Sequence, residues 1–297
     1  MTQRAAFLGL GAIGRPMATH VARAFDLCVW NRTGERAQDF ARGQGCRSAP
    51  TPRAAVEGAE VVIACLPTSG EVFGILEGTD GAAAGLSRGA LFLDCTSGSP
   101  EGARRLAARL ADLGVAYAGC PVSGGTNGAT AGTLAVMVGA DPAVFERAQP
   151  ILALFGKRIE HLGPVGTGSA LKAVNNALLA ANILTFGEGF AALASAGLPV
   201  RRALDVINVS SGRSFVTEVL APERILTGAF PQTFRLALLE KDVGIAVEFL
   251  AAEGLEAPVL RQVREVMLKT RALLGEEADY LEAVRLYERQ AGAEIRG

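Results

Sequence analysis

The chain has 297 residues, 49% of them hydrophobic, with 36 glycines and a formal net charge of −1. This composition is typical of a globular protein with a core large enough for two domains, and it excludes a disordered chain. No dense basic run is present, so nothing indicates binding to nucleic acid or to an anionic membrane.

The sequence predicts neither a targeting segment nor a membrane span. The opening residues lead directly into a glycine motif, without the apolar core and cleavage site of a signal peptide. Residues 173–187 carry no Asp, Glu, Lys or Arg, but they are fewer than the roughly 20 that cross a bilayer. The five cysteines are scattered without metal-ligand spacing, which favours a reduced, cytoplasmic protein that binds no metal.

A glycine motif lies between a short apolar run, Ala5–Leu10, and a helical pattern that begins at Arg15. A second apolar run, Leu27–Trp30, follows, so the order is strand, glycine turn, helix and strand, as a dinucleotide-binding motif requires. The motif consists of Gly9, Leu10, Gly11, Ala12, Ile13 and Gly14. Its glycines would permit the tight turn, let the backbone approach a pyrophosphate, and let the helix pack closely on the strand. The alternative is a tight turn that binds no ligand.

The end of the second strand indicates which dinucleotide is bound. A site that prefers NAD usually has an acidic residue here to hold the ribose 2′-hydroxyl. Asn31 stands about where that acid belongs, and Arg32 and Thr33 follow. The missing acid removes repulsion of a 2′-phosphate, and a guanidinium is a permanently charged partner for it. We therefore expect NADP to be preferred, with NAD also accepted; an arginine on a solvated loop is the alternative.

Two further predicted strands end in polar residues at the carboxyl edge of the sheet, where ligands bind in doubly wound folds. Val61–Leu66 is followed by Pro67, and Ala90–Leu93 is followed closely by Thr96 and Ser97. The hydroxyl residues in these segments also precede helical patterns, so helix capping and ligand contact stay open as alternatives. These residues are Thr68, Ser69, Thr96, Ser97 and Ser99.

A third polar segment contains Ser123, Gly124 and Gly125. Adjacent glycines expose backbone amides beside a hydroxyl, which suits a carboxylate; a turn into the next strand is the alternative. Strands are predicted around it at Val115–Tyr117, Leu134–Val138 and Ile159–Leu162, and the last would complete the sheet. His20 and His161 stand alone in the sequence and are not expected to be catalytic or to bind metal.

The segment from Gly163 to Asn176 separates the alternating strand and helix patterns from a region that is almost wholly helical. Ligand sites are common at such boundaries. Lys172 lies in the first turns of a long helix, with Asn176 one turn further on the same face and Asn175 close to that face. A partly desolvated lysine has a lowered pKa and suits proton transfer. A lysine that extends its ammonium to water is the alternative.

After about residue 164 the predicted elements are helices, punctuated by glycine and proline. They span roughly 168–196, 200–211, 214–226, 233–253, 258–274 and 279–290. Lys241 and Asp242 lie within one of them, where a surface ion pair is the simplest interpretation. The patterns predict an α/β Rossmann domain with a doubly wound, mostly parallel sheet over residues 1–163. An all-helical domain over 164–297 would be joined to it by the long helix.

In this order the motifs resemble those of the β-hydroxyacid dehydrogenases, most closely the 3-hydroxyisobutyrate dehydrogenases, over essentially the whole chain. The segments that carry the resemblance are 9–17, 121–125, 166–176 and the pair at 241–242. The resemblance implies hydride transfer between nicotinamide C4 and the alcohol carbon of a small 3-hydroxy acid, without metal. It further implies a step of valine catabolism, and a homodimer or homotetramer that packs through the helical domain.

By the same resemblance, Lys172 is the general acid/base and Asn176 helps to position substrate and lysine. Substrate contacts are implied for Ser123, Gly124, Gly125, Thr96 and Asn175. Cofactor contacts are implied for the glycine motif and for Asn31, Arg32, Thr33, Leu66, Pro67, Thr96, Ser97 and Lys241, the last supported by Asp242.

The chain departs from the family pattern at Gly119-Cys120, where Asp-Ala often precedes the substrate loop. It has Asn175 and Leu179 where the related 6-phosphogluconate dehydrogenases have His and Glu, so a phosphogluconate substrate is not expected. Three hypotheses follow. The first is an NADP-preferring 3-hydroxy acid dehydrogenase, and the second a reductase of glyoxylate or of tartronate or succinate semialdehyde. The third, a non-catalytic NADP-binding regulatory module, would need neither Lys172 nor Asn176.

Overall fold

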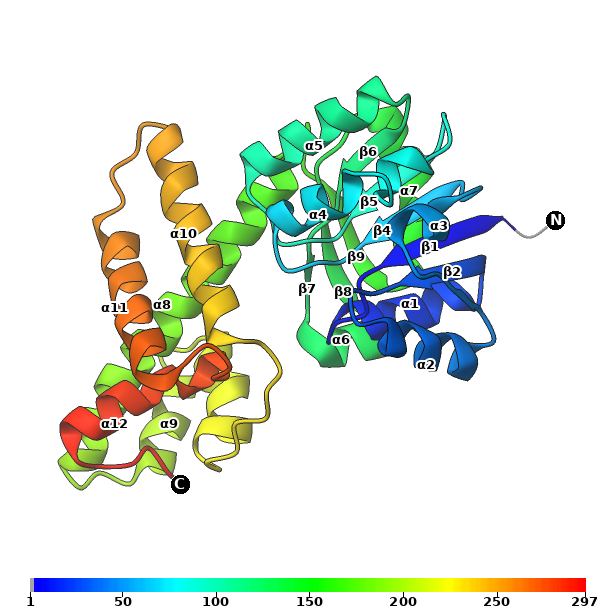
Figure 1. The fold of residues 1–297 in the computed structure, drawn as a ribbon. Coiled ribbons are helices and arrows are strands. Elements are labelled where there is room, and N and C mark those ends of the chain that lie inside the picture. The colour runs from blue at the N-terminus through cyan, green and yellow to red at the C-terminus, as the bar shows by residue number, and fades with distance from the viewer. Residues whose placement is uncertain (1–2) are drawn as a thin grey trace. The chain divides into compact units, whose positions relative to one another are not determined.

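The chain folds as two units, Met1–Lys172 and Ala173–Gly297, in a computed structural model that describes residues 3–297. Six parallel strands form the central sheet of the N-terminal unit, in the order β3-β2-β1-β4-β5-β6 (Figure 1). Their bounds are β1 Arg4–Leu8, β2 Asp26–Trp30, β3 Arg47–Ser48, β4 Val61–Ala64, β5 Leu91–Asp94 and β6 Ala116–Gly119. The predicted doubly wound parallel sheet is confirmed, with its change of direction between β1 and β4.

Alternate residues of the strands face two different helical layers. In β1, Ala5 and Phe7 lie in a core that includes side chains of α1, α2 and α7, whereas Ala6 and Leu8 lie in a second core with α3, α4 and α5. The first layer consists of α1 (Gly14–Ala22), α2 (Gly34–Gln44) and α7 (Pro142–Leu152). The second consists of α3 (Pro52–Val56), α4 (Ser69–Leu76), η1 (Ala82–Ala84) and α5 (Pro100–Asp112). Because both faces are covered, the inner strands are apolar almost throughout.

A second, three-stranded sheet in the same unit corrects one prediction. The expected strand at Ile159–Leu162 does not complete the main sheet, because β9 (Gly156–His161) pairs only with β8 (Leu134–Val138), in the order β7-β8-β9. The strand β7 (Val122–Ser123), which pairs antiparallel with β8, was not predicted. The short helix α6 (Gly125–Ala131) connects β7 to β8, so the chain reverses there without the long crossover that a parallel neighbour needs.

The long helix α8 spans Thr167–Ser195, and the boundary between the two units falls inside it, after Lys172. In the C-terminal unit it contributes Ala177, Ile183 and Phe190 to a helical core. Among residues 3–297, α8 is the one helix long and apolar enough to cross a membrane. Its apolar part is longer than the charge-free residues 173–187 indicated. One such helix is weak evidence, because the core helix of a soluble protein passes the same test.

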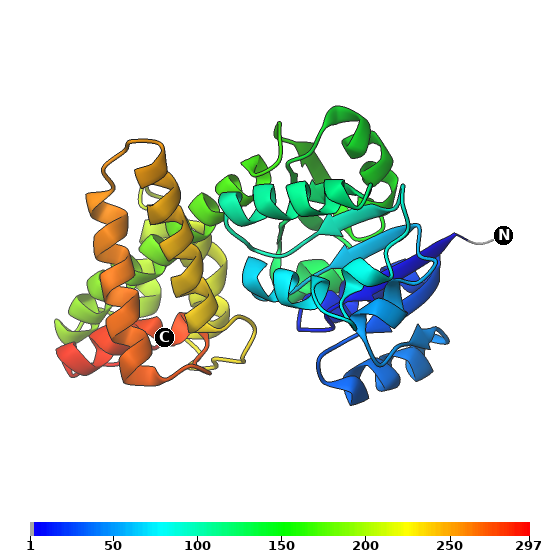
Figure 2. The same cartoon turned by 45° about the horizontal axis from the view of Figure 1, so that its top comes forward.

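The C-terminal unit is helical, as predicted. After α8 its elements are α9 (Val200–Asn208), the π-helix η2 (Val216–Ile225), α10 (Leu236–Ala252), α11 (Pro258–Leu274), η3 (Tyr280–Val284) and α12 (Arg285–Ala291). Figures 1 and 2 show α10 and α11 side by side as an antiparallel pair. The connection between them contains Gly254, whose φ of +74° suits the end of a helix, and Pro258 begins α11.

Candidate functional site

The glycine motif forms the turn between β1 and α1, and two of its glycines cannot be replaced without displacing backbone. Gly9 has a φ of +104°, and a Cβ on it would lie 2.4 Å from the carbonyl oxygen of Cys65. A Cβ on Gly14 would lie 2.1 Å from the carbonyl oxygen of Gly9, whereas one on Gly11 would meet no atom within 4 Å. The first turn of α1 has no side-chain cap and no acidic residue. This open, uncapped helix start fits a pyrophosphate.

The Asn31 side chain ties this turn to the end of β2. Its Oδ1 accepts a hydrogen bond from the amide of Leu10 at 3.0 Å, and its Nδ2 donates to the carbonyl oxygen of Thr33 at 3.0 Å. Arg32 extends into solvent with 84% of its side chain exposed, and its Nη1 lies 3.3 Å from Oε1 of Glu71. The ion pair with Glu71 was not anticipated, because the two residues are 39 positions apart.

The ends of β4 and β5 are joined through the Thr96 hydroxyl. Its Oγ1 accepts a hydrogen bond from the amide of Leu66 at 3.1 Å, while the Thr96 amide donates to Oδ1 of Asp94 at 3.0 Å. Oδ2 of Asp94 accepts from the hydroxyl of Tyr117 at 3.1 Å. Asp94 is only 4% exposed, and this burial raises the pKa of its carboxyl, although the hydrogen bonds from Thr96 and Tyr117 act in the opposite direction.

No role was predicted for Asp94, and its position at the end of an apolar strand was the available signal. The structure separates the hydroxyl residues that cap helices from one that does not. Thr68 caps α4 by accepting from the amide of Glu71, and Ser99 caps α5 by accepting from that of Gly102. Thr96 is a buried bridge between strand ends instead. Pro67, Ser69 and Ser97 are half-buried beside these segments.

The Ser123 loop and the start of α8 both contact the same strand. Ser123 lies opposite Ala135 in the pairing of β7 with β8, and Gly124 and Gly125 follow as exposed residues at the start of α6. A Cβ on Gly168, in the first turn of α8, would lie 2.1 Å from the carbonyl oxygen of Met137 in β8. Only glycine permits that approach, so β8 fixes where the helix that carries Lys172 begins.

Lys172 and Asn176 lie one turn apart on α8, and both are buried, at 9% and 3% exposure. Nδ2 of Asn176 donates to Oδ2 of Asp242 in α10 at 2.6 Å, and its Oδ1 accepts from Nδ2 of Asn175 at 3.1 Å. Because a carboxylate only accepts hydrogen bonds, Asp242 determines which way the Asn176 amide faces.

Of the two interpretations of Asp242, a surface ion pair and a support for Lys241, the structure contradicts the first. Its side chain is 2% exposed, and Nζ of Lys241 lies 3.0 Å from its Oδ1. The Lys241 side chain is 22% exposed, so this pair lies at the edge of a buried site rather than on a solvated face. The contact between Asp242 and Asn176 joins residues 66 positions apart, which no local pattern predicted.

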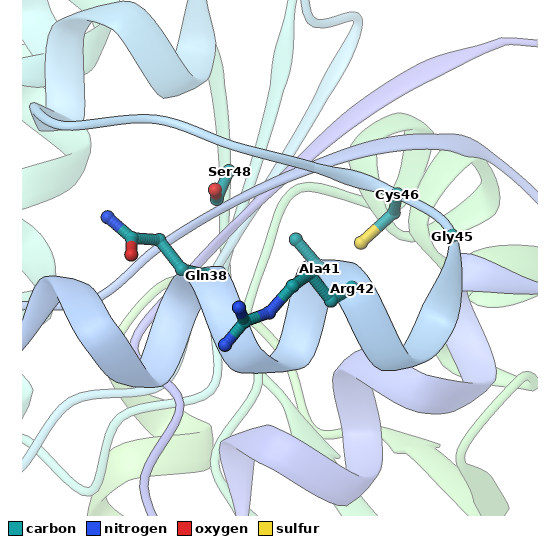
Figure 3. Close-up of a pocket in the computed structure, with 6 residues that line it drawn as sticks. All are labelled: Gln38, Ala41, Arg42, Gly45, Cys46 and Ser48. Atoms are coloured by element: carbon teal, nitrogen blue, oxygen red, sulfur yellow. The ribbon is translucent and has the colours of Figure 1, made fainter.

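The two histidines and the pocket beside β3 lie apart from the residues described above. His20 and His161 place Nε2 3.1 Å and 2.8 Å from the carbonyl oxygens of Ala129 and Ala140, which is a structural use of each ring. In the described part of the chain, no three His, Cys, Asp or Glu side chains form a potential metal site. A pocket of about 550 Å³ lies beside the edge strand β3 and contains none of the predicted site residues. Figure 3 shows its lining of Gln38, Ala41, Arg42, Gly45, Cys46 and Ser48.

Two protein families match consecutive parts of the chain. The family described as the NAD-binding domain of 6-phosphogluconate dehydrogenase matches residues 4–163. The family described as NAD-binding of NADP-dependent 3-hydroxyisobutyrate dehydrogenase matches residues 166–287.

Individual relatives match over nearly the whole length. The chain is 35% identical to 2-(hydroxymethyl)glutarate dehydrogenase of Eubacterium barkeri, covering 98% of this chain and 97% of the relative. It is 32% identical to 2-hydroxy-3-oxopropionate reductase of Escherichia coli, covering 97% and 98%. The solved structure of Mycobacterium tuberculosis 3-hydroxyisobutyrate dehydrogenase with L-serine has a TM-score of 0.86 and 31% identity, covering 96% of this chain and 99% of that one. The chain belongs to the β-hydroxyacid dehydrogenase family, whose members are NAD(P)-binding oxidoreductases.

Proposed function

We propose that the protein is an NADP-preferring dehydrogenase of a small 3-hydroxy acid, most specifically a 3-hydroxyisobutyrate dehydrogenase. The observation that carries this proposal is the pair of buried polar side chains, Lys172 and Asn176, one turn apart on α8 in a member of this family. The match of residues 166–287 to the NADP-dependent 3-hydroxyisobutyrate dehydrogenases supports the same substrate class and cofactor.

The cofactor would be held by the carboxyl edge of the main sheet. The turn from Gly9 to Gly14 would receive the pyrophosphate, and Asn31, Arg32 and Thr33 the adenosine ribose and its 2′-phosphate. Leu66, Pro67, Thr96 and Ser97 would lie along the rest of the dinucleotide, with Lys241 as a contact from the helical unit. The bound nicotinamide supplies or accepts the hydride.

The remaining residues would act on the substrate. Ser123, Gly124 and Gly125 would bind its carboxylate through a hydroxyl and exposed amides, with Thr96 and Asn175 as further contacts. Lys172 would take the hydroxyl proton during oxidation and return it during reduction. Asn176, whose amide is oriented by Asp242, would hold the substrate oxygen and the lysine in register.

A second candidate within the family is a semialdehyde reductase that works mainly in the direction of alcohol formation. The 32% identity to 2-hydroxy-3-oxopropionate reductase of Escherichia coli favours this candidate. The two candidates share residues and chemistry and differ in the side group of the substrate and in the main direction of the reaction. A non-catalytic binding module has no comparable support.

The domain assignment also belongs to this proposal. Residues 1–163 would be the dinucleotide-binding domain, and 164–297 the domain that completes the substrate site and mediates a homodimer or homotetramer. We propose a cytoplasmic enzyme, consistent with five free thiols and a mixed charge distribution.

The proposal is tested by measuring turnover of NADPH with a panel of semialdehydes, and of NADP⁺ with the matching hydroxy acids. Lys172→Ala is expected to lower kcat by roughly two to four orders of magnitude, the usual scale for loss of a general acid/base, with NADPH binding nearly unchanged. Lys172→Arg should restore little, because a guanidinium stays protonated. In the wild type, kcat/KM for oxidation should rise with pH, and that rise should vanish in Lys172→Ala. An alanine variant within a few-fold of wild type, or one with the same pH profile, would assign proton transfer elsewhere.

A further inference from the structure

A carboxylate faces the arginine that we assign to the 2′-phosphate. Oε1 of Glu71 lies 3.3 Å from Nη1 of Arg32, and the Glu71 side chain is 34% exposed against 84% for Arg32. The better-buried partner is therefore the acid, which belongs to α4, the helix that follows β4. The end of β2 lacks an acid, but a different element supplies one beside Arg32.

The Glu71 side chain is partly exposed and lies beside Thr68, the residue that caps α4. Its own amide donates to Oγ1 of Thr68 at 3.1 Å, and the Thr68 hydroxyl donates to its Oε2 at 3.5 Å. On the other side, Asn31 fixes the turn that carries Arg32 to the glycine loop through the amide of Leu10. Both members of the ion pair are thus attached to segments that border the same dinucleotide turn.

We propose that Glu71 is a specificity-determining residue that limits the preference for NADP over NAD. It occupies the guanidinium that would otherwise bind the 2′-phosphate, and its negative charge repels that phosphate. For NAD it offers the carboxylate acceptor for the ribose 2′-hydroxyl that Asn31 does not supply. This inference rests on the proposed role of Arg32 in 2′-phosphate binding.

The test is a fluorescence titration of the full-length protein with NADPH and with NADH, without substrate. Glu71→Gln removes the charge but keeps the shape of the side chain. The matched control is Glu77→Gln, which removes a carboxylate from the other end of the same helix, where Glu77 pairs with Arg109 at 2.9 Å. Glu71→Gln is also measured in the Arg32→Gln variant, to determine whether Glu71 acts by binding the Arg32 guanidinium.

We expect Glu71→Gln to raise the ratio of the Kd for NADH to the Kd for NADPH by about two- to fivefold, the range for removing one exposed charge contact. Glu77→Gln should leave the ratio unchanged, and the Glu71 effect should shrink in Arg32→Gln. The inference is wrong if the ratio does not move in Glu71→Gln, or if both affinities fall together. If the wild type binds NADH more tightly but the ratio still rises in Glu71→Gln, the proposed NADP preference is wrong and this inference stands.

Discussion

Replacing Asp242 with alanine is expected to destabilise the helical unit and to disturb the Asn176 amide. The wild-type bond from Nδ2 of Asn176 to Oδ2 of Asp242 is 2.6 Å long, and the two side chains belong to residues that are 3% and 1% exposed. A buried hydrogen bond to a charged group contributes about 1.5–3 kcal/mol, and an orphaned buried donor costs about 1–3 kcal/mol. The two contributions describe partly the same loss and are not simply added. We therefore expect the free energy of unfolding to fall by about 2–4 kcal/mol.

The conservative variant Asp242→Asn separates geometry from charge. Its amide oxygen can still accept from Asn176, so we expect its stability to lie within about 1 kcal/mol of wild type. The surface control is Asp205→Ala, which removes an exposed carboxylate 3.6 Å from Arg201 and should change stability by less than about 0.5 kcal/mol.

Urea unfolding of the full-length protein, followed by circular dichroism, measures these differences. A double-mutant cycle with Asn176→Ala should give a coupling energy of about 1–2 kcal/mol between the two positions. In turnover assays, Asp242→Ala should lower kcat in the wild-type background but hardly at all when Asn176 is already alanine. A coupling energy near zero, or an unchanged kcat in Asp242→Ala, would refute the idea that Asp242 acts by orienting Asn176.

Four further predictions concern the N-terminal unit and α8. Burial raises the pKa of the Asp94 carboxyl in the folded state above its value in the unfolded chain. The free energy of unfolding should therefore fall as pH rises from the ordinary carboxyl pKa toward the raised one. Asp94→Asn should reduce this fall, as measured by urea titrations between pH 4 and 8. Gly168→Ala should destabilise by about 1–3 kcal/mol, because its Cβ would lie 2.1 Å from a backbone oxygen. Gly189→Ala, on the same helix, would place a Cβ with no neighbouring atom within 4 Å and should stabilise by about 0.5–1 kcal/mol; urea unfolding measures both glycine variants. Asn31→Asp with Arg32→Ile should reverse or erase the preference for NADPH in kcat/KM, and a wild type that prefers NADH would contradict our interpretation of this turn.

Local sequence patterns were sufficient for the longer elements and their order, but not for the two-residue strands β3 and β7. The apolar runs that gave β1, β4 and β5 are short and buried on both faces, and glycine and proline marked the helix ends from α8 onward. The glycine motif was recognisable because its glycines lie within six residues, although Gly9 is also constrained by the distant Cys65. These features depend on backbone conformation and burial, which neighbouring residues largely set.

The tertiary structure alone decided which distant groups meet. Asn176 finds Asp242, Arg32 finds Glu71, and Asp94 joins Thr96 to Tyr117, because packed helices and adjacent strands bring together side chains whose spacing in the sequence carries no period. The same holds for the separate sheet around β8, since strand pairing depends on how the chain reverses between strands and not on their apolar content. The sequence around an amide or a carboxylate is the same whether that group is solvated or buried against a partner. Its role therefore follows from the fold.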